Sequence, residues 1–135
     1  MDKKIQVSRT IKFRAWDVFA KEMDYEVTID PDGKVAAFNP LDGQYVRGFS
    51  DDEKVIMQYT GLKDRNGKEI YEGDILAWQD HKHLWSTADD SFTAKATVKF
   101  DLVELKYTVG HLSLSAKREF EVIGNIYETP LEDTP

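Results

Sequence analysis

The chain has 135 residues, enough for one domain with a buried core. It contains no cysteine, which excludes disulfide bonds and a thiol nucleophile, and its net charge of −7 disfavours general nucleic-acid binding, which depends on basic side chains. No apolar run approaches the roughly 18 residues of a membrane span. The first ten residues also lack the apolar core of a secretory signal, so we expect a cytoplasmic protein.

The N-terminal third is predicted to be β structure. Residues 11–17 alternate between apolar and polar side chains, which predicts a strand with one apolar face. Residues 18–23 predict a loop or a single helical turn. Residues 25–38 predict a hairpin around a Pro-Asp-Gly turn, and residues 44–46 predict a further strand. Residues 50–53 have capping-box spacing, which favours a short helical turn.

The central block of the chain is the most strongly patterned. The alternation over residues 55–60 predicts a strand that ends at Gly61. A tight turn is expected at residues 64–67, where Asn and Gly tolerate positive φ, followed by a short return over residues 69–71. Residues 75–78 then predict a buried strand.

The C-terminal part is less regular. Residues 79–93 are polar and mixed, which predicts a long mobile loop. Strands are expected over residues 95–100 and 105–109, separated by a turn, whereas residues 110–117 are ambiguous. Residues 120–127 predict the last strand, with apolar residues on both faces and a bulge or close backbone contact at Gly124.

The segment QYTGLKDRNGKEIYEGDIL, residues 58–76, resembles the central motif of the YopX family of phage and prophage proteins. The family also opens with a segment similar to residues 11–17 and closes with one similar to residues 122–127. The resemblance implies a compact β domain with an SH3-like barrel component, and it implies no activity. We therefore expect a mainly β fold with little helix, in a single domain over residues 1–135. An N-terminal β-hairpin layer, about residues 10–50, would pack on a small SH3-like barrel, about residues 54–128, in the cytoplasm of a bacterial host.

One group of residues has the composition of a metal site. His81 and His83 share a face if they lie on a strand, and Asp80, Asp89 and Asp90 are near in sequence. The spacing is too loose to specify a site, so a solvated polar loop is favoured and no metal or cofactor is predicted.

Four carboxylates lie in or beside the patterned segments: Asp17, Asp64, Glu72 and Asp74. Paired carboxylates can perform acid–base catalysis, but acids beside Gly and Asn more often accept hydrogen bonds from their own backbone and fix turns. We therefore predict no catalytic residue. A hydrolase that uses Asp64, Glu72 or Asp74 is the weaker alternative.

A non-catalytic module that binds a host or phage protein is the favoured function. Aromatic and polar side chains of the patterned segments are the candidate binding residues: Arg14, Trp16, Tyr59, Asn66, Lys68, Tyr71, Asn125 and Tyr127. Two interpretations of Trp16 are open. The favoured one is packing, either on a small cluster or as a stack on Arg14. The other is an exposed aromatic-cationic contact site. The alternative function is nucleic-acid binding by a small barrel through Lys12, Arg14 and Lys68.

Assembly is the final expectation. Residues 11–16 lie near a polar terminus and carry basic side chains on one face, which predicts an edge strand. Because uncovered β edges tend to find partners, a homo-oligomer, most simply a two-fold dimer, is expected.

Overall fold

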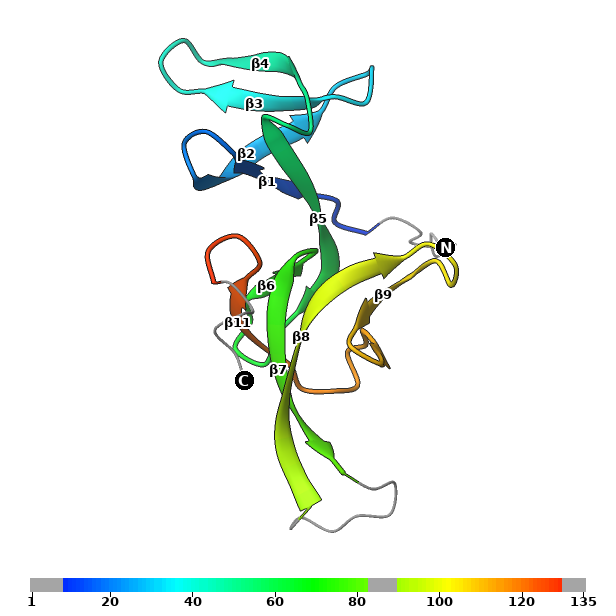
Figure 1. Ribbon diagram of the computed structural model, residues 1–135. Coiled ribbons are helices and arrows are strands. Elements are labelled where there is room, and N and C mark those ends of the chain that lie inside the picture. The colour runs from blue at the N-terminus through cyan, green and yellow to red at the C-terminus, as the bar shows by residue number, and fades with distance from the viewer. Residues whose placement is uncertain (1–8, 83–89, 130–135) are drawn as a thin grey trace, which may run out of the picture.

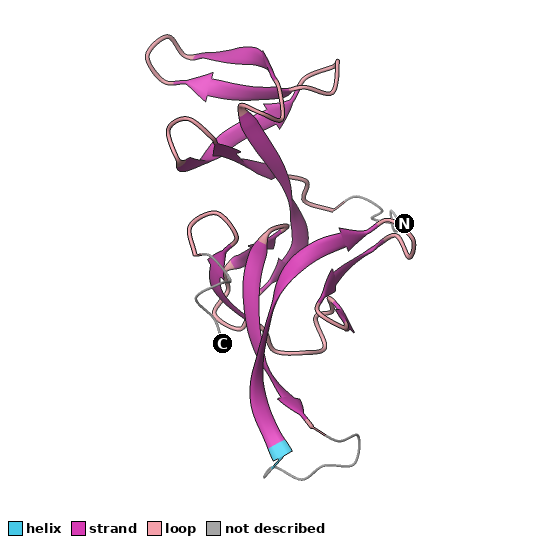
Figure 2. Cartoon of the chain, in the orientation of Figure 1, coloured by secondary structure: helices cyan, strands magenta, loops and turns pink. Residues whose placement is uncertain are grey.

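The computed structural model describes residues 9–82 and 90–129 and consists of antiparallel strands joined by short turns (Figures 1 and 2). The mainly β class predicted from the sequence is confirmed. The strands form two open sheets rather than a closed barrel. Within the described residues, no helix is both long and apolar enough to cross a membrane.

The first sheet has six strands in the order β4-β3-β2-β1-β5-β6. Their bounds are β1 Phe13–Asp17, β2 Glu22–Ile29, β3 Val35–Asn39, β4 Gln44–Phe49, β5 Lys54–Lys63 and β6 Glu69–Tyr71. The hairpin predicted over residues 25–38 is confirmed as β2 and β3. Four of the strands form an N-terminal layer, in which Ala15, Val27, Val35 and Ala37 make a small core.

The second sheet has five strands in the order β10-β9-β8-β7-β11. Their bounds are β7 Asp74–His81, β8 Ser91–Asp101, β9 Lys106–Val109, β10 Leu112–Ser113 and β11 Glu121–Asn125. Its inner face covers a larger core, made of Ile70, Leu76, Trp78, Val98, Val109 and Phe120. Burial of these large side chains supplies most of the driving force for this half of the fold.

Strand β5 joins the two halves. Its first part pairs with β1, from Lys54 opposite Asp17 to Gln58 opposite Phe13, and its second part pairs with β6. Figure 1 shows β5 running from the N-terminal layer down to β6, beside the second sheet. The two cores are therefore connected through a continuous strand as well as through side chains.

Three predictions about strands are wrong. Strand β1 is not an edge, because β2 and β5 pair with its two sides. Strand β5 does not end at Gly61, because a register shift with positive φ at this glycine lets the strand continue to Lys63. The predicted loop over residues 79–93 is partly strand, because β7 continues to His81 and β8 begins at Ser91. Residues 83–89 lie outside the described residues.

The last strand is shorter than predicted but has the predicted irregularity. Strand β11 ends at Asn125, and its register with β7 shifts between Val122 and Gly124. This shift confirms the bulge predicted at Gly124. A Cβ at this glycine would lie 2.5 Å from Thr129 Oγ1, so a side chain also packs closely on it.

Candidate functional site

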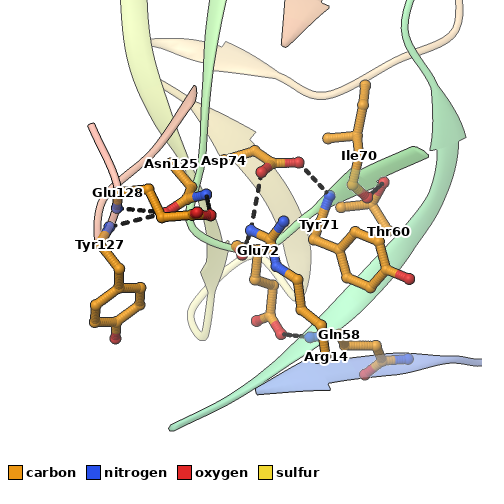
Figure 3. A network of polar contacts seen from close by, with 10 residues as sticks. All are labelled: Arg14, Gln58, Thr60, Ile70, Tyr71, Glu72, Asp74, Asn125, Tyr127 and Glu128. Carbon is orange, nitrogen blue, oxygen red and sulfur yellow. Dashed lines mark hydrogen bonds and ion pairs between the residues drawn. The ribbon is translucent and has the colours of Figure 1, made fainter. Parts of the chain in front are cut away.

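Several of the predicted binding residues lie at the joint between the two halves, where Arg14 of β1 reaches the turn between β6 and β7 (Figure 3). Arg14 Nη2 donates to Asp74 Oδ1 at 2.9 Å and to the Glu72 carbonyl oxygen at 3.1 Å. Its guanidinium carbon lies 4.7 Å from the centroid of the Tyr71 ring. The two charged side chains are only 3% and 2% exposed, so Arg14 is a buried structural cation rather than a surface one.

The carboxylates at this joint are held by backbone groups. Asp74 Oδ2 accepts from the Tyr71 amide at 2.8 Å, and Glu72 Oε1 accepts from the Gln58 amide at 2.6 Å. Burial raises the pKa of Asp74, against the Tyr71 hydrogen bond and the Arg14 charge, which lower it. Glu72 and Asp74, two of the three carboxylates of the hydrolase alternative, therefore accept hydrogen bonds from the protein's own backbone.

Gly73 allows the turn at the joint to close. It has a φ of 85°, its amide donates to the Val98 carbonyl, and its carbonyl accepts from the Ile126 amide. A Cβ at this position would lie 3.0 Å from Met57 Sδ. The backbone conformation therefore favours glycine, and a larger residue would also require the Met57 side chain to shift.

Aromatic side chains surround the joint. Trp16 stacks on Tyr127, with ring centroids 5.3 Å apart and an interplanar angle of 13°. Trp16 therefore packs, as favoured from the sequence, but on Tyr127 rather than on Arg14. Tyr71 also contacts Tyr59 and Tyr25, at centroid distances of 5.6 and 6.1 Å.

Asn125 and Asp64 fix turns. Asn125 Oδ1 accepts from the amides of Tyr127 and Glu128 (Figure 3). Asp64 accepts from three amides, those of Asn66, Lys68 and Val122, at 2.8 to 2.9 Å. Burial raises the pKa of Asp64, but these hydrogen bonds outweigh it and the net pKa is lowered. The turn-fixing role predicted for Asp64 is confirmed.

The predicted candidates thus divide into two groups. Six of them gather at the joint or beside it, and Arg14, Tyr59, Tyr71 and Asn125 are buried there. Asn66 and Lys68 lie instead in the exposed turn between β5 and β6. Among the buried members, Arg14 joins the two halves and Asn125 fixes a turn, so these side chains offer little surface to a partner.

The histidine-containing segment has a different arrangement from the one considered for a metal. Asp80 Oδ2 lies 3.1 Å from Trp78 Nε1 and 3.4 Å from His111 Nε2. Over residues 9–82 and 90–129, His and acidic side chains form no group of three suited to a metal ion. His83 and Asp89 lie outside the described residues.

Three hairpins share one turn design that the sequence reading did not identify. Each loop has four residues, and the carbonyl of the preceding Asp17, Asn39 or Asp101 accepts from the amide of the last loop residue at 2.8 to 2.9 Å. A side-chain oxygen of the same Asp or Asn accepts from the second loop residue. That second residue is apolar and exposed in all three: Phe19 79%, Leu41 94% and Val103 90%.

The last loop residue has positive φ in all three turns. It is Gly43 between β3 and β4, with φ 70°, but Lys21 between β1 and β2 and Leu105 between β8 and β9, with φ 56° and 55°. A leucine in this conformation is strained. Leu102, Val103 and Leu105, which we call the apolar tip, are 81%, 90% and 72% exposed. The sequence contains a signal for this tip that the prediction of strands and turns did not use, namely three large aliphatic residues in a turn that favours glycine.

A basic surface is also assembled from two separate segments. The Arg65 amide donates to the Phe120 carbonyl at 2.9 Å, which places the β5–β6 turn beside the loop before β11. Arg65 and Arg118 both line a hollow of about 310 Å³, together with Trp78, Gln79, Glu119 and Glu121. Lys63 and Lys117 are exposed on the same two segments. The sequence gives no dense basic run, so only the fold reveals this grouping.

The fold and the joint define an all-antiparallel-β protein of two linked open sheets. The family model described as "YopX protein" matches residues 12–132, and the chain belongs to this family. Protein EF1440 from Enterococcus faecalis is similar, with 29% identity, a TM-score of 0.60, and coverage of 91% of this chain and 97% of that chain. Protein yopX from Bacillus subtilis shares the fold, with 20% identity, a TM-score of 0.52, and coverage of 87% and 94%. Among curated proteins, none matches this chain.

Proposed function

We propose that this YopX-family chain is a phage- or prophage-type accessory protein that acts as a non-catalytic module and binds a protein partner through its apolar tip. The main support for this proposal is Leu105, which is both strained and exposed. Holding a leucine at positive φ costs free energy. Glycine adopts the same conformation without this cost, as Gly43 does in the equivalent turn. An outlier of this kind supports a functional hypothesis when its side chain is also accessible.

Hydrogen bonds fix the conformation of the apolar tip. Asp101 Oδ1 accepts from the amides of Val103 and Glu104, and the Asp101 carbonyl accepts from Leu105. These bonds fix the loop, so little conformational entropy would be lost on binding. At the base of the hairpin, Phe100 packs edge-on against Tyr107 at 5.1 Å. A rigid loop that presents aliphatic side chains suits an apolar pocket on another protein.

The test is affinity capture from prophage-induced bacterial cells, with the wild type compared with a Leu102→Ser/Val103→Ser variant. The matched control is Phe19→Ser, which removes an exposed apolar side chain from the equivalent turn between β1 and β2. We expect a partner that the wild type and Phe19→Ser recover and the tip variant loses. Equal recovery by all three proteins, or no partner for any of them, would contradict the proposal.

Nucleic-acid binding is the second candidate, and the basic surface favours it. Lys63, Arg65, Lys117 and Arg118 come from two segments that the fold brings together. Arg14, which the sequence suggested for this role, is unsuited because it is buried against Asp74. Glu119 and Glu121 beside the same hollow weaken the local positive potential, which keeps this candidate second.

A gel-shift titration on single- and double-stranded DNA and RNA, repeated at increasing salt, tests the second candidate. The variant Arg65→Gln/Arg118→Gln should abolish any shift, whereas the control Lys95→Gln/Lys99→Gln removes the same charge from β8. Binding that both variants weaken equally would indicate a general charge effect rather than a site.

A further inference from the structure

We propose that β4 accepts an extended, basic segment of a partner protein as an added strand at the edge of the N-terminal layer. This surface is separate from the apolar tip and does not depend on it. Strand β4 is last in the order of its sheet, and no described strand pairs with its outer side. Figure 1 shows it at the far end of the N-terminal layer.

Strand β4 is the most suitable edge of the two sheets. It has six residues, against three for β6, two for β10 and five for β11. All of its residues except Phe49 are exposed. An edge strand directs alternate N–H and C=O groups away from its neighbour, and these groups can bind a further strand.

A bulge limits the part of β4 that can pair. Val46 lies opposite Ala37, and Phe49 lies opposite Val35, so Arg47 and Gly48 together oppose Ala36. Such a bulge increases the local twist and discourages unselective edge pairing. We therefore expect the added strand to form its ladder with residues 44–46 and to continue beyond the bulge toward the Phe49 end.

The Phe49 end of β4 is acidic. Asp32, Asp51 and Asp52 line a surface hollow of about 510 Å³ together with Lys34 and Phe49. Within the described part of the chain, no hydrogen bond or ion pair engages these three carboxylates. Residues 17–53 hold ten acidic and three basic side chains, which accounts for the whole net charge of −7. The chemistry at this end therefore fits lysine or arginine.

The opposite end of β4 is apolar. Leu41 in the preceding turn is almost fully exposed, and Tyr45 and Val46 are about half exposed. Tyr45 is held by an edge-on contact with Phe38, at a centroid distance of 5.5 Å. The fitting occupant thus has apolar side chains at one end and basic ones at the other. A second copy of this chain is disfavoured, because pairing two such layers would bring two charges of −7 together.

The test is fluorescence anisotropy with a labelled, terminally blocked octapeptide in which threonine alternates with valine in one half and with lysine in the other. Both orders of the halves are used, because an added strand can run in either direction. The first comparison peptide replaces lysine with glutamate. The second carries N-methyl groups on alternate amides in either frame, which removes backbone donors without changing charge.

We expect saturable binding of one lysine peptide and at least about tenfold weaker binding of the glutamate and N-methylated peptides. The variant Asp51→Asn/Asp52→Asn should weaken the lysine peptide about tenfold, whereas the control Glu104→Gln/Glu119→Gln removes the same charge elsewhere and should change it less than about twofold. Hydrogen exchange with bound peptide should slow at residues 44–46.

Several results would overturn the proposal. One is the absence of binding up to about 1 mM peptide. Equal affinity for the N-methylated peptide would show that backbone pairing is not involved. Equal losses in the two charge variants would show unselective attraction. Slowed exchange at β10 or β11 would place the site elsewhere. If exchange at residues 44–46 slows with increasing protein concentration in the absence of peptide, the occupant is a second copy of the chain.

Discussion

Arg14 and Asp74 form a buried ion pair that joins the two halves of the protein, with Nη2 and Oδ1 2.9 Å apart. The pair is completed by the Glu72 carbonyl on the arginine side and the Tyr71 amide on the aspartate side. Arg14 Nε is enclosed without a hydrogen-bond partner among the described residues. Such a pair contributes less to stability than its geometry suggests, but removal of one partner is costly because the other charge stays buried.

The first prediction concerns that remaining charge. Asp74→Asn leaves the Arg14 cation buried and should lower the free energy of unfolding by about 3–5 kcal/mol at pH 7. Arg14→Met should cost a similar amount at pH 7. Urea titrations give both values, and in the double variant the losses should be well below the sum of the single ones. Additive losses would show that the pair is not coupled.

The pH dependence separates the two single variants. Burial raises the pKa of Asp74, and loss of the Arg14 charge removes an effect that lowers it. A carboxyl whose folded-state pKa is raised binds more protons when folded, so stability rises as the pH falls from the folded pKa toward the unfolded value of about 3.9. Arg14→Met should therefore recover stability relative to the wild type as the pH falls from 7 toward about 3.9, whereas Asp74→Asn should not.

The second prediction concerns Asp64, whose pKa is lowered by its three backbone hydrogen bonds. Its contribution is present above the unfolded pKa of about 3.9 and is lost as the pH falls through the lower, folded value. Asp64→Asn places an amide donor against at least one N–H and should cost about 1–3 kcal/mol at pH 7. The variant should also show a flatter loss of stability below about pH 4, measured by urea unfolding. If Asp64→Asn loses stability below about pH 4 as steeply as the wild type does, the lowered pKa of Asp64 is contradicted.

The third prediction concerns the stack of Trp16 on Tyr127. A double-mutant cycle with Trp16→Ala and Tyr127→Ala should give a coupling energy of about 0.5–1.5 kcal/mol in thermal or urea unfolding. Phe38→Ala paired with Trp16→Ala is the control, because Phe38 packs on Tyr45 rather than on Trp16. Coupling no larger than that of the control pair would show that the stack adds nothing beyond burial.

The fourth prediction concerns the strain at Leu105. Leu105→Gly should keep stability or raise it by up to about 1 kcal/mol, because glycine adopts positive φ without the steric cost that leucine has. Gly43→Leu in the equivalent turn should lower stability by a similar amount. Thermal unfolding measures both changes. A clear loss of stability for Leu105→Gly would mean that the side chain has a packing role and would remove the argument from strain.

Much of the local structure could be predicted from the sequence because it depends on short-range chemistry. The turn at residues 64–67 and the bulge at Gly124 follow from Asp, Asn and Gly at positions that need their backbone freedom or side-chain oxygen. The alternation in residues 25–38 similarly identified the β2–β3 hairpin. These features require no knowledge of distant partners.

Features that depend on distant partners were mistaken or missed. Strand β1 resembled an edge because Lys12 and Arg14 are charged, whereas Arg14 is buried against Asp74, 60 residues away. The basic surface at Arg65 and Arg118 likewise depends on a contact between separate segments. A single sequence shows the charge of a residue but not the residue that will neutralise it.

The contacts at the joint have a consequence for how the chain acquires its structure. Arg14 needs Asp74, and the Asp64 carboxylate needs the Val122 amide 58 residues further on. Contacts at this separation close slowly, so we expect folding in milliseconds to seconds rather than microseconds. During translation, the N-terminal layer emerges with an unpaired arginine on β1, and the last amide for Asp64 follows that residue by 58 positions. Until Val122 has left the ribosome, the central turn at Asp64 is therefore incompletely bonded.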